Sequence, residues 1–81
     1  MPGYNTRVEF KGSAYMVQTQ DKGLAAQYVE TLIYKSGRLL TSRKTRYTHL
    51  MSSSDVKAAI ERIMEDQHKQ VLDEIVEGKL A

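Results

Sequence analysis

The chain of 81 residues has no cysteine and no tryptophan, and it has a single phenylalanine. Without cysteine there is no disulfide, no thiolate ligand for a metal and no cysteine nucleophile. No apolar run approaches the length of about 18 residues that suggests a membrane-spanning helix, and the first residues lack an apolar signal-peptide core. We therefore expect one soluble, cytoplasmic domain that makes no contact with a membrane.

The sequence also lacks the motifs of the common enzyme classes. It contains no glycine-rich dinucleotide or phosphate loop and no nucleophile elbow. Its carboxylates are spread along one segment, so no pair is indicated for general acid–base catalysis. Glu65 and His68 have the spacing of a metal-binding pair, but such sites need further carboxylates on facing helices. A polar position within a helix explains this pair better, and we expect no enzyme activity, no cofactor and no bound metal.

A net charge of +2 conceals an uneven distribution of charge. Residues 1–54 carry eight basic and three acidic side chains, whereas residues 55–77 carry three basic and seven acidic ones. The first part of the chain is thus basic and the last part is acidic. This polarity by itself selects no particular partner.

Residues 6–11 and 14–20 alternate between apolar and polar side chains, which is typical of half-buried strands. Gly12 and Ser13 lie between them and have the composition of a two-residue hairpin turn. This turn predicts three cross-strand pairs on one face: Phe10–Tyr15, Val8–Val17 and Thr6–Thr19.

A second hairpin follows. Residues 27–35 are rich in β-branched and aromatic side chains, Ser36-Gly37 forms a tight turn, and residues 38–47 form the fourth strand. Both faces carry apolar groups, so one face should meet a helix while the other exposes tyrosines and leucines beside Arg43. The predicted pairs are Ile33–Leu40, Thr31–Ser42, Tyr34–Leu39, Leu32–Thr41, Glu30–Arg43 and Tyr28–Thr45. A one-residue bulge at Gly37 would change them.

The pattern from about residue 55 to 77 predicts one long helix. Ser52 to Asp55 are good N-cap residues, and Gly78 suits the left-handed position after the last turn. Apolar pairs recur every four residues, interrupted by Gln67 and His68. Together with the hairpins, this predicts an α+β fold: a four-stranded antiparallel meander over about residues 5–47, followed by one long C-terminal helix.

The helix pattern also bears on oligomeric state. A four-residue repeat drifts by about 40° per step, so the apolar stripe turns by roughly 160° along the helix. A helix of roughly 35 Å also exceeds the width of about 19 Å of four strands. Either a second surface covers part of the stripe, or the helix is kinked near Gln67 or lies along the strands. With a second surface, Val56, Ile60 and Ile63 pack on the first hairpin. The predicted homodimer interface is then Leu72, Ile75 and Val76.

Several motifs resemble a family of small bacterial proteins. They are Asn5-Thr6-x-Val8, Lys11-Gly12-x-x-Tyr15-x-Val17-Gln18-Thr19 and Asp21-x-Gly23. Residues 30–43 and 65–69 are similar as well, so the resemblance extends over most of the chain. Gln20 stands where the family pattern has glutamate. The family has no known function, so the resemblance implies no activity.

The basic segment from Lys35 to Tyr47 is the best functional indication. Its cations could follow phosphates while tyrosines stack on bases. The nucleic-acid candidates are Arg38, Arg43, Lys44, Arg46, Tyr34 and Tyr47. Four strands followed by a helix are also similar in architecture to the PUR repeat and to a transcriptional coactivator domain, both single-strand binders, but their motifs are absent.

A charged edge strand that prevents aggregation explains the same basic residues more simply. We therefore expect a non-catalytic interaction module, homodimeric and with a protein partner. A single-stranded nucleic-acid-binding protein that uses the basic second hairpin is the alternative.

Overall fold

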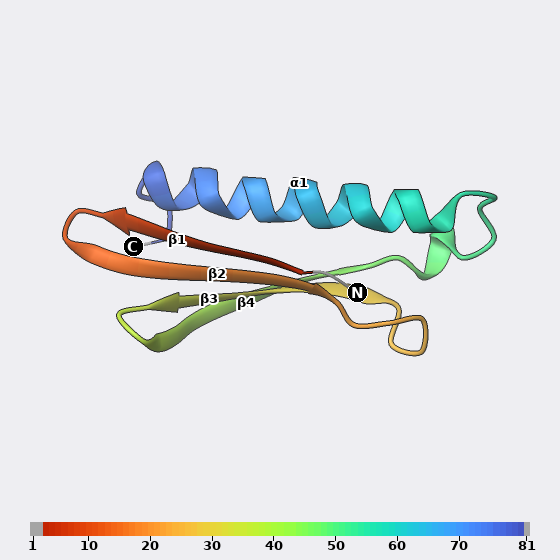
Figure 1. The fold of residues 1–81 in the computed structure, drawn as a ribbon, viewed down its shortest axis with the longest axis horizontal. Coiled ribbons are helices and arrows are strands. Elements are labelled where there is room, and N and C mark those ends of the chain that lie inside the picture. The colour runs from red at the N-terminus through yellow and green to blue at the C-terminus, as the bar shows by residue number, and fades with distance from the viewer. Residues whose placement is uncertain (1–2, 81) are drawn as a thin grey trace.

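The computed structural model describes residues 3–80, which form one sheet and one long helix (Figure 1). The elements are β1 (Tyr4–Phe10), β2 (Ser13–Asp21), β3 (Tyr28–Lys35), β4 (Arg38–Arg46), the 3-10 helix η1 (Thr48–Leu50) and α1 (Val56–Val76). The strands lie in the order β1-β2-β3-β4, and each neighbouring pair is antiparallel. The predicted α+β fold, a meander followed by a C-terminal helix, is confirmed.

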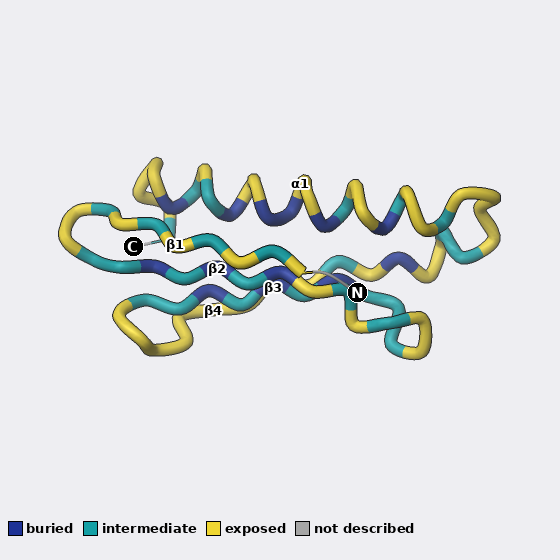
Figure 2. Tube along the Cα trace, in the orientation of Figure 1, coloured by how far each residue is buried: buried dark blue, intermediate teal, exposed yellow. Residues whose placement is uncertain are grey.

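The helix lies along the strands and covers one face of the sheet (Figure 1). Its 21 residues span about 31 Å at about 1.5 Å per residue. The nine residues of β2 span about 30 Å at about 3.3 Å per residue, so the two layers match in length. The molecule is elongated, with extents of 44, 20 and 18 Å. On the opposite face of the sheet, no second layer is formed by any part of residues 3–80 (Figure 2).

The buried side of α1 is continuous along most of its length (Figure 2). Its buried residues are Ile60, Met64, Gln67, His68, Val71 and Ile75. The fifteen steps from Ile60 to Ile75, at about 100° each, exceed four full turns by only about 60°. The predicted drift of roughly 160° assumed that every step is four residues. The buried residues also include three-residue steps, from Met64 to Gln67 and from His68 to Val71, which turn the stripe back. The twist of the sheet accommodates the remaining drift.

The second half of α1 packs on the chain's own sheet. Val71 and Ile75 form an apolar cluster with Tyr15, Val17 and Ile33, and Leu72 packs against it. Ile75 is 1% exposed, so it is a core residue and not a surface residue that a second copy would cover. Val76, by contrast, is 54% exposed. The apolar stripe therefore gives no reason to expect a homodimer, because the chain's own sheet already covers most of it.

The first half of α1 packs on the other end of the sheet. Ile60 and Met64 form a second apolar cluster with Val29 and Tyr47. The predicted packing of Ile60 on the first hairpin's Tyr15 and Val17 is wrong. The helix runs in the direction that brings its C-terminal half to those two residues.

β1 and β2 pair two residues away from the predicted register. The turn residues are Lys11 and Gly12, with φ angles of 51° and 81°, as a type I′ turn requires of both central residues. The resulting pairs are Phe10–Ser13, Val8–Tyr15 and Thr6–Val17. A shift of two residues leaves each side chain on its face, because side chains alternate with a period of two. The apolar face is thus as predicted, while the cross-strand partners are not.

β4 contains an irregularity at Leu40. The predicted turn, Ser36-Gly37, is present with φ angles of 52° and 83°. Beyond it, however, Ile33 pairs with Thr41 and not with Leu40. The bulge therefore lies at Leu40, three residues after Gly37, the position considered for a bulge from the sequence.

The bulge sets the two faces of the rest of β4. A one-residue shift turns the side chains that follow to opposite faces of the sheet. Arg43 and Thr45 pair with buried residues of β3 and lie on the helix side. Lys44 and Arg46 lie on the open side. The cations beside the partly exposed tyrosines are thus Lys44 and Arg46, and the predicted place of Arg43 among them is wrong.

The two ends of α1 differ. Asp55 is the N-cap residue, but its side chain makes no capping hydrogen bond. At the other end Gly78 has the predicted left-handed conformation, with a φ angle of 76°. The N–H groups of Gly78 and Lys79 donate to the carbonyls of Ile75 and Glu74 at 3.0 and 2.8 Å, which is a Schellman motif.

Candidate interaction surface

A buried layer of polar side chains crosses the molecule between the two apolar clusters. Gln67 and His68 of α1 supply its helix side, at 4% and 7% exposure. Four threonines, one from each strand, supply its sheet side: Thr6, Thr19, Thr31 and Thr45. His68 contacts the Thr6 hydroxyl through Nε2 at 2.8 Å and the Thr19 hydroxyl through Nδ1 at 2.7 Å. Gln67 donates to the Thr31 hydroxyl at 2.8 Å and accepts from Thr45.

One assignment of protons gives every nitrogen and oxygen of this layer a hydrogen-bond partner. The hydroxyls of Thr19 and Thr31 lie 2.8 Å apart, and Thr31 already accepts from Gln67. In this assignment the Thr31 hydroxyl donates to Thr19, and the Thr19 hydroxyl donates to Nδ1 of His68. The Nε2–H of His68 then donates to the Thr6 hydroxyl. Only the Thr6 hydroxyl proton has no acceptor within the layer. This assignment requires a neutral imidazole. Burial favours the same state, because it lowers the pKa of His68 below the usual histidine value.

The structure places the candidate metal-binding pair, Glu65 and His68, where neither side chain is arranged to bind a metal ion. Both ring nitrogens of His68 are bonded to threonines, and Glu65 beside it on the helix is exposed. Within residues 3–80, no three His, Asp or Glu side chains are grouped to hold a metal ion. Every buried side-chain nitrogen or oxygen in this range has a hydrogen-bond partner. No buried side-chain nitrogen or oxygen in this range is left without a partner for a ligand to meet.

Tyr47 lies inside the molecule. Its side chain is fully buried in the second apolar cluster, and its hydroxyl donates to Asp21 Oδ1 at 2.5 Å or to the Gly23 carbonyl at 3.0 Å. Burial, together with the Asp21 carboxylate, raises the pKa of Tyr47 to about 12. The predicted stacking of Tyr47 on a base is therefore wrong, because its ring has no exposed face.

Arg43 is held under the helix. Its Nη1 and Nη2 atoms donate to the two carboxylate oxygens of Glu74, each at 2.8 Å. These hydrogen bonds raise the pKa of Arg43 and lower the pKa of Glu74. This ion pair joins α1 to the edge strand β4, which takes Arg43 out of the predicted nucleic-acid surface.

The open face of the sheet carries exposed apolar side chains. The pairing register aligns Met16, Tyr34 and Leu39 across β2, β3 and β4, and Arg7 of β1 ends the row. Leu32 lies in the next row on the same face. Leu39 is 57% exposed and the other three are partly exposed. Met16, Leu32, Tyr34 and Leu39 are called the open-face patch below.

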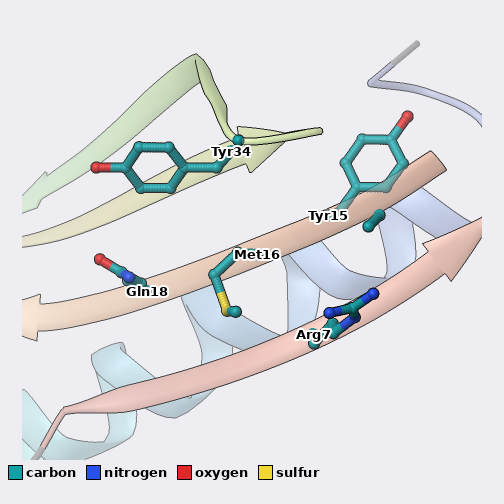
Figure 3. A pocket seen from close by; sticks show the side chains of 7 residues that line it. Arg7, Tyr15, Met16, Gln18 and Tyr34 are labelled. Carbon is teal, nitrogen blue, oxygen red and sulfur yellow. The ribbon is translucent and has the colours of Figure 1, made fainter.

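A hollow of about 330 Å³ lies within this face (Figure 3). Met16 and Tyr34 line it together with Arg7 and Gln18, which are its main polar side chains. Arg7 is paired with Glu9 at 3.1 Å, but both side chains are more than 60% exposed. Such an exposed pair is worth little, so Arg7 is free to turn toward a bound group.

The basic residues of β4 flank the patch. Lys44 and Arg46 lie on the open face, and the Lys44 ammonium is 5.2 Å from the centre of the Tyr28 ring. Arg38 is exposed at the end of the hairpin, where it pairs with Lys35. The structure thus brings Tyr34, Lys44 and Arg46 to one face.

Sequence reasoning did not find the contribution of β2 to this face. Met16 and Gln18 alternate with the buried Tyr15 and Val17, so the strand pattern itself placed them on the outward side. The pattern of the second hairpin predicted an exposed face with tyrosines and leucines, but it did not indicate that Met16 and Gln18 continue this face across β2.

No helix within residues 3–80 is long and apolar enough to cross a membrane. No protein-family model, no curated protein and no solved structure matches the chain.

Proposed function

We propose that this protein is a non-catalytic interaction module that binds a protein partner through the open face of its sheet. The observation that carries the proposal is the open-face patch, a set of apolar side chains on a sheet face without a second layer within residues 3–80. Covering one such side chain fully is worth roughly 1.5–3 kcal/mol. Exposed apolar patches with a charged rim are characteristic of interaction sites.

The surrounding charges suit a binding face. Arg7, beside Glu9, lies at one end of the patch, and Lys44 and Arg46 lie at the other, where Glu30 is opposite Lys44, so the apolar centre has a charged rim. Interfaces of this kind combine an apolar core with a polar border. The buried polar layer, whose groups bond to one another, fits a structural role and leaves recognition to the open face.

Affinity capture from native lysate, with and without nuclease, tests the proposal. The bait is compared with a variant in which Tyr34 and Leu39 are both replaced by Ser, and with a control in which Glu61 and Lys69 on the exposed side of α1 are replaced by Gln. A partner retained by the bait and the control after nuclease, but lost from the patch variant, is the expected result. Equal recovery by all three proteins contradicts it.

Binding of single-stranded nucleic acid is a second candidate, because two tyrosines and two cations share the open face. Tyr28 and Tyr34 could stack on bases while Lys44 and Arg46 contact phosphates. Fluorescence anisotropy with labelled oligonucleotides at about 50 mM salt tests this candidate, because even non-specific binding shows at low salt.

Two matched variants each remove two positive charges, one from the open face of the sheet and the other from the exposed side of α1. Replacing Lys44 and Arg46 by Ala should weaken oligonucleotide binding and reduce its salt dependence. Replacing Lys57 and Lys69 of α1 by Ala should change neither. Absence of binding by the unmodified protein excludes this candidate.

A further inference from the structure

β4 is an edge strand with unpaired backbone groups. In an antiparallel ladder, hydrogen-bonded and non-hydrogen-bonded pairs alternate. The N–H of Tyr47 donates to the Gln27 carbonyl at 3.0 Å, which fixes the odd-numbered residues up to the bulge as those bonded to β3. The N–H and C=O groups of Ser42, Lys44 and Arg46 therefore point away from β3, toward the open edge. The Ser42 carbonyl there also accepts a long hydrogen bond of 3.5 Å from the hydroxyl of its neighbour Thr41.

This edge is accessible over its length. The helix covers β1, β2 and β3, and β4 lies beyond it at the border of the sheet (Figure 1). Seven of the nine residues of β4 are exposed, and the other two, Arg43 and Thr45, are bonded to the helix. An extended segment could align beside β4 without displacing any element of residues 3–80.

The charge of the edge selects the occupant. β4 carries four basic residues and no acidic one: Arg38, Arg43, Lys44 and Arg46. Among these four, only Arg43 forms an ion pair with another side chain of residues 3–80. Antiparallel pairing of β4 with the β4 of a second copy would bring like charges together, which is destabilising. An acidic segment has the opposite charge and avoids this repulsion.

We propose that β4 binds an extended, acidic segment of a partner protein as a fifth strand of the sheet. The inference rests on the proposed function and names its partner class. Backbone hydrogen bonds to Ser42, Lys44 and Arg46 give the added strand its position, and alternate side chains give it specificity. Acidic residues at every second position lie on the open face beside Lys44 and Arg46, where opposite charges pair across strands.

A synthetic ten-residue peptide of alternating valine and glutamate is the probe. Amide hydrogen exchange followed by NMR reads the outcome at single residues. The amides of Ser42, Lys44 and Arg46 should exchange fast in the free protein and become protected with bound peptide. A peptide with lysine in place of glutamate, and an acidic peptide N-methylated at alternate residues, should give no protection. Unchanged exchange at all three amides at saturating acidic peptide overturns the proposal.

A matched pair of variants at position 44 separates the backbone from the charge. Lys44→Ala removes the charge and keeps the N–H, whereas Lys44→Pro also removes the N–H, which β3 does not use. Proline is tolerated on the outer side of edge strands. Loss of the backbone bond should weaken peptide binding by roughly tenfold beyond the alanine variant, the factor expected for one net hydrogen bond. Equal binding by two folded variants contradicts strand addition.

These outcomes are distinct from a failure of the proposed function. If a partner is lost when Tyr34 and Leu39 are replaced but bound equally by the two position-44 variants, the open face is the binding site and strand addition is refuted. If the protein alone forms dimers by light scattering, and Lys44→Pro abolishes them, the edge binds a second copy and the acidic partner is refuted.

Discussion

Thr19 and His68 lie 49 positions apart in the chain, yet the Thr19 hydroxyl is 2.7 Å from Nδ1 of His68 in the buried interior. Through this contact the centre of α1 is attached to the second strand. The Thr6 hydroxyl holds the other ring nitrogen at 2.8 Å. Because an unpaired buried polar group is costly, this layer specifies how far the helix can slide along the strands.

Replacing His68 with Ala should destabilise the fold. The substitution removes the ring to which the buried Thr19 hydroxyl and the partly buried Thr6 hydroxyl are bonded. An unsatisfied buried polar group costs about 1–3 kcal/mol, and Thr19 keeps its bond to Thr31. Urea unfolding at neutral pH measures the change. His49, which is exposed, provides the control, because its replacement by Ala should change the free energy of unfolding by no more than about 0.5 kcal/mol. Equal effects of the two substitutions would contradict the role of the polar layer.

Stability should also depend on pH through His68. Burial lowers its pKa in the folded state, so the unfolded state binds more protons near the ordinary histidine pKa of about 6.5. The contribution is fully present above this value and is lost as pH falls through it toward the lower pKa of the folded state. Glu74, whose pKa is lowered by Arg43, acts in the same direction but only below about pH 4.5.

The pH effect is measured by urea unfolding of the protein at several values between about pH 8 and pH 5, the range around the histidine pKa. Stability should fall toward the acidic end in the unmodified protein and in His49→Ala, and should be flatter in His68→Ala. A profile that is the same in all three proteins, or that rises toward acid, would contradict a buried neutral His68.

The Arg43–Glu74 pair should couple more strongly than the exposed Arg7–Glu9 pair. Both oxygens of Glu74 are bonded, and its side chain is 20% exposed, whereas that of Glu9 is 71% exposed. Double-mutant cycles with Ala at each position should give about 1 kcal/mol for the first pair and a few tenths of a kcal/mol, roughly, for the second. Similar coupling energies would mean that the ion pair does not join α1 to β4.

Ile75 and Val76 are adjacent in α1 but should respond very differently to truncation. Ile75 is 1% exposed and Val76 is 54% exposed. Ile75→Ala removes core contacts at a cost of about 2–5 kcal/mol, and Val76→Ala should cost no more than about 0.5 kcal/mol. Thermal unfolding at two protein concentrations measures both. A small effect of Ile75→Ala, or one that depends strongly on protein concentration, would contradict a core position of Ile75 and would favour an interface between two copies.

The helix and the strands could be predicted from the sequence because the patterns that indicate them are local. Turn residues such as Gly37 and Gly78, and the alternation along each strand, act within a few positions. The first hairpin's register was missed because Lys11 adopts a positive φ that lysine adopts only rarely. Even so, the error of two residues left the apolar face intact.

Features that depend on distant partners were not predictable from local pattern. In the sequence, Gln67 and His68 resemble an exposed interruption of the apolar stripe. They can be buried because threonines of the sheet form hydrogen bonds with them, which offset the cost of removing polar groups from water. The sequence pattern does not reveal the bulge at Leu40, because apolar groups lie on both faces of this segment. The bulge shifts the register by one residue, which places Arg43 on the helix side beside Glu74 and not on the open face.

Leu39 and Val76 provide the most direct test of the open face as the binding surface. Their side chains are almost equally exposed, at 57% and 54%, but Leu39 lies in the open-face patch and Val76 lies on α1. Methyl NMR of the protein mixed with its captured partner compares the two directly. We expect large shifts or broadening of the Leu39 methyl signals, while those of Val76 stay unchanged. Perturbation of Val76 with Leu39 unaffected would contradict it.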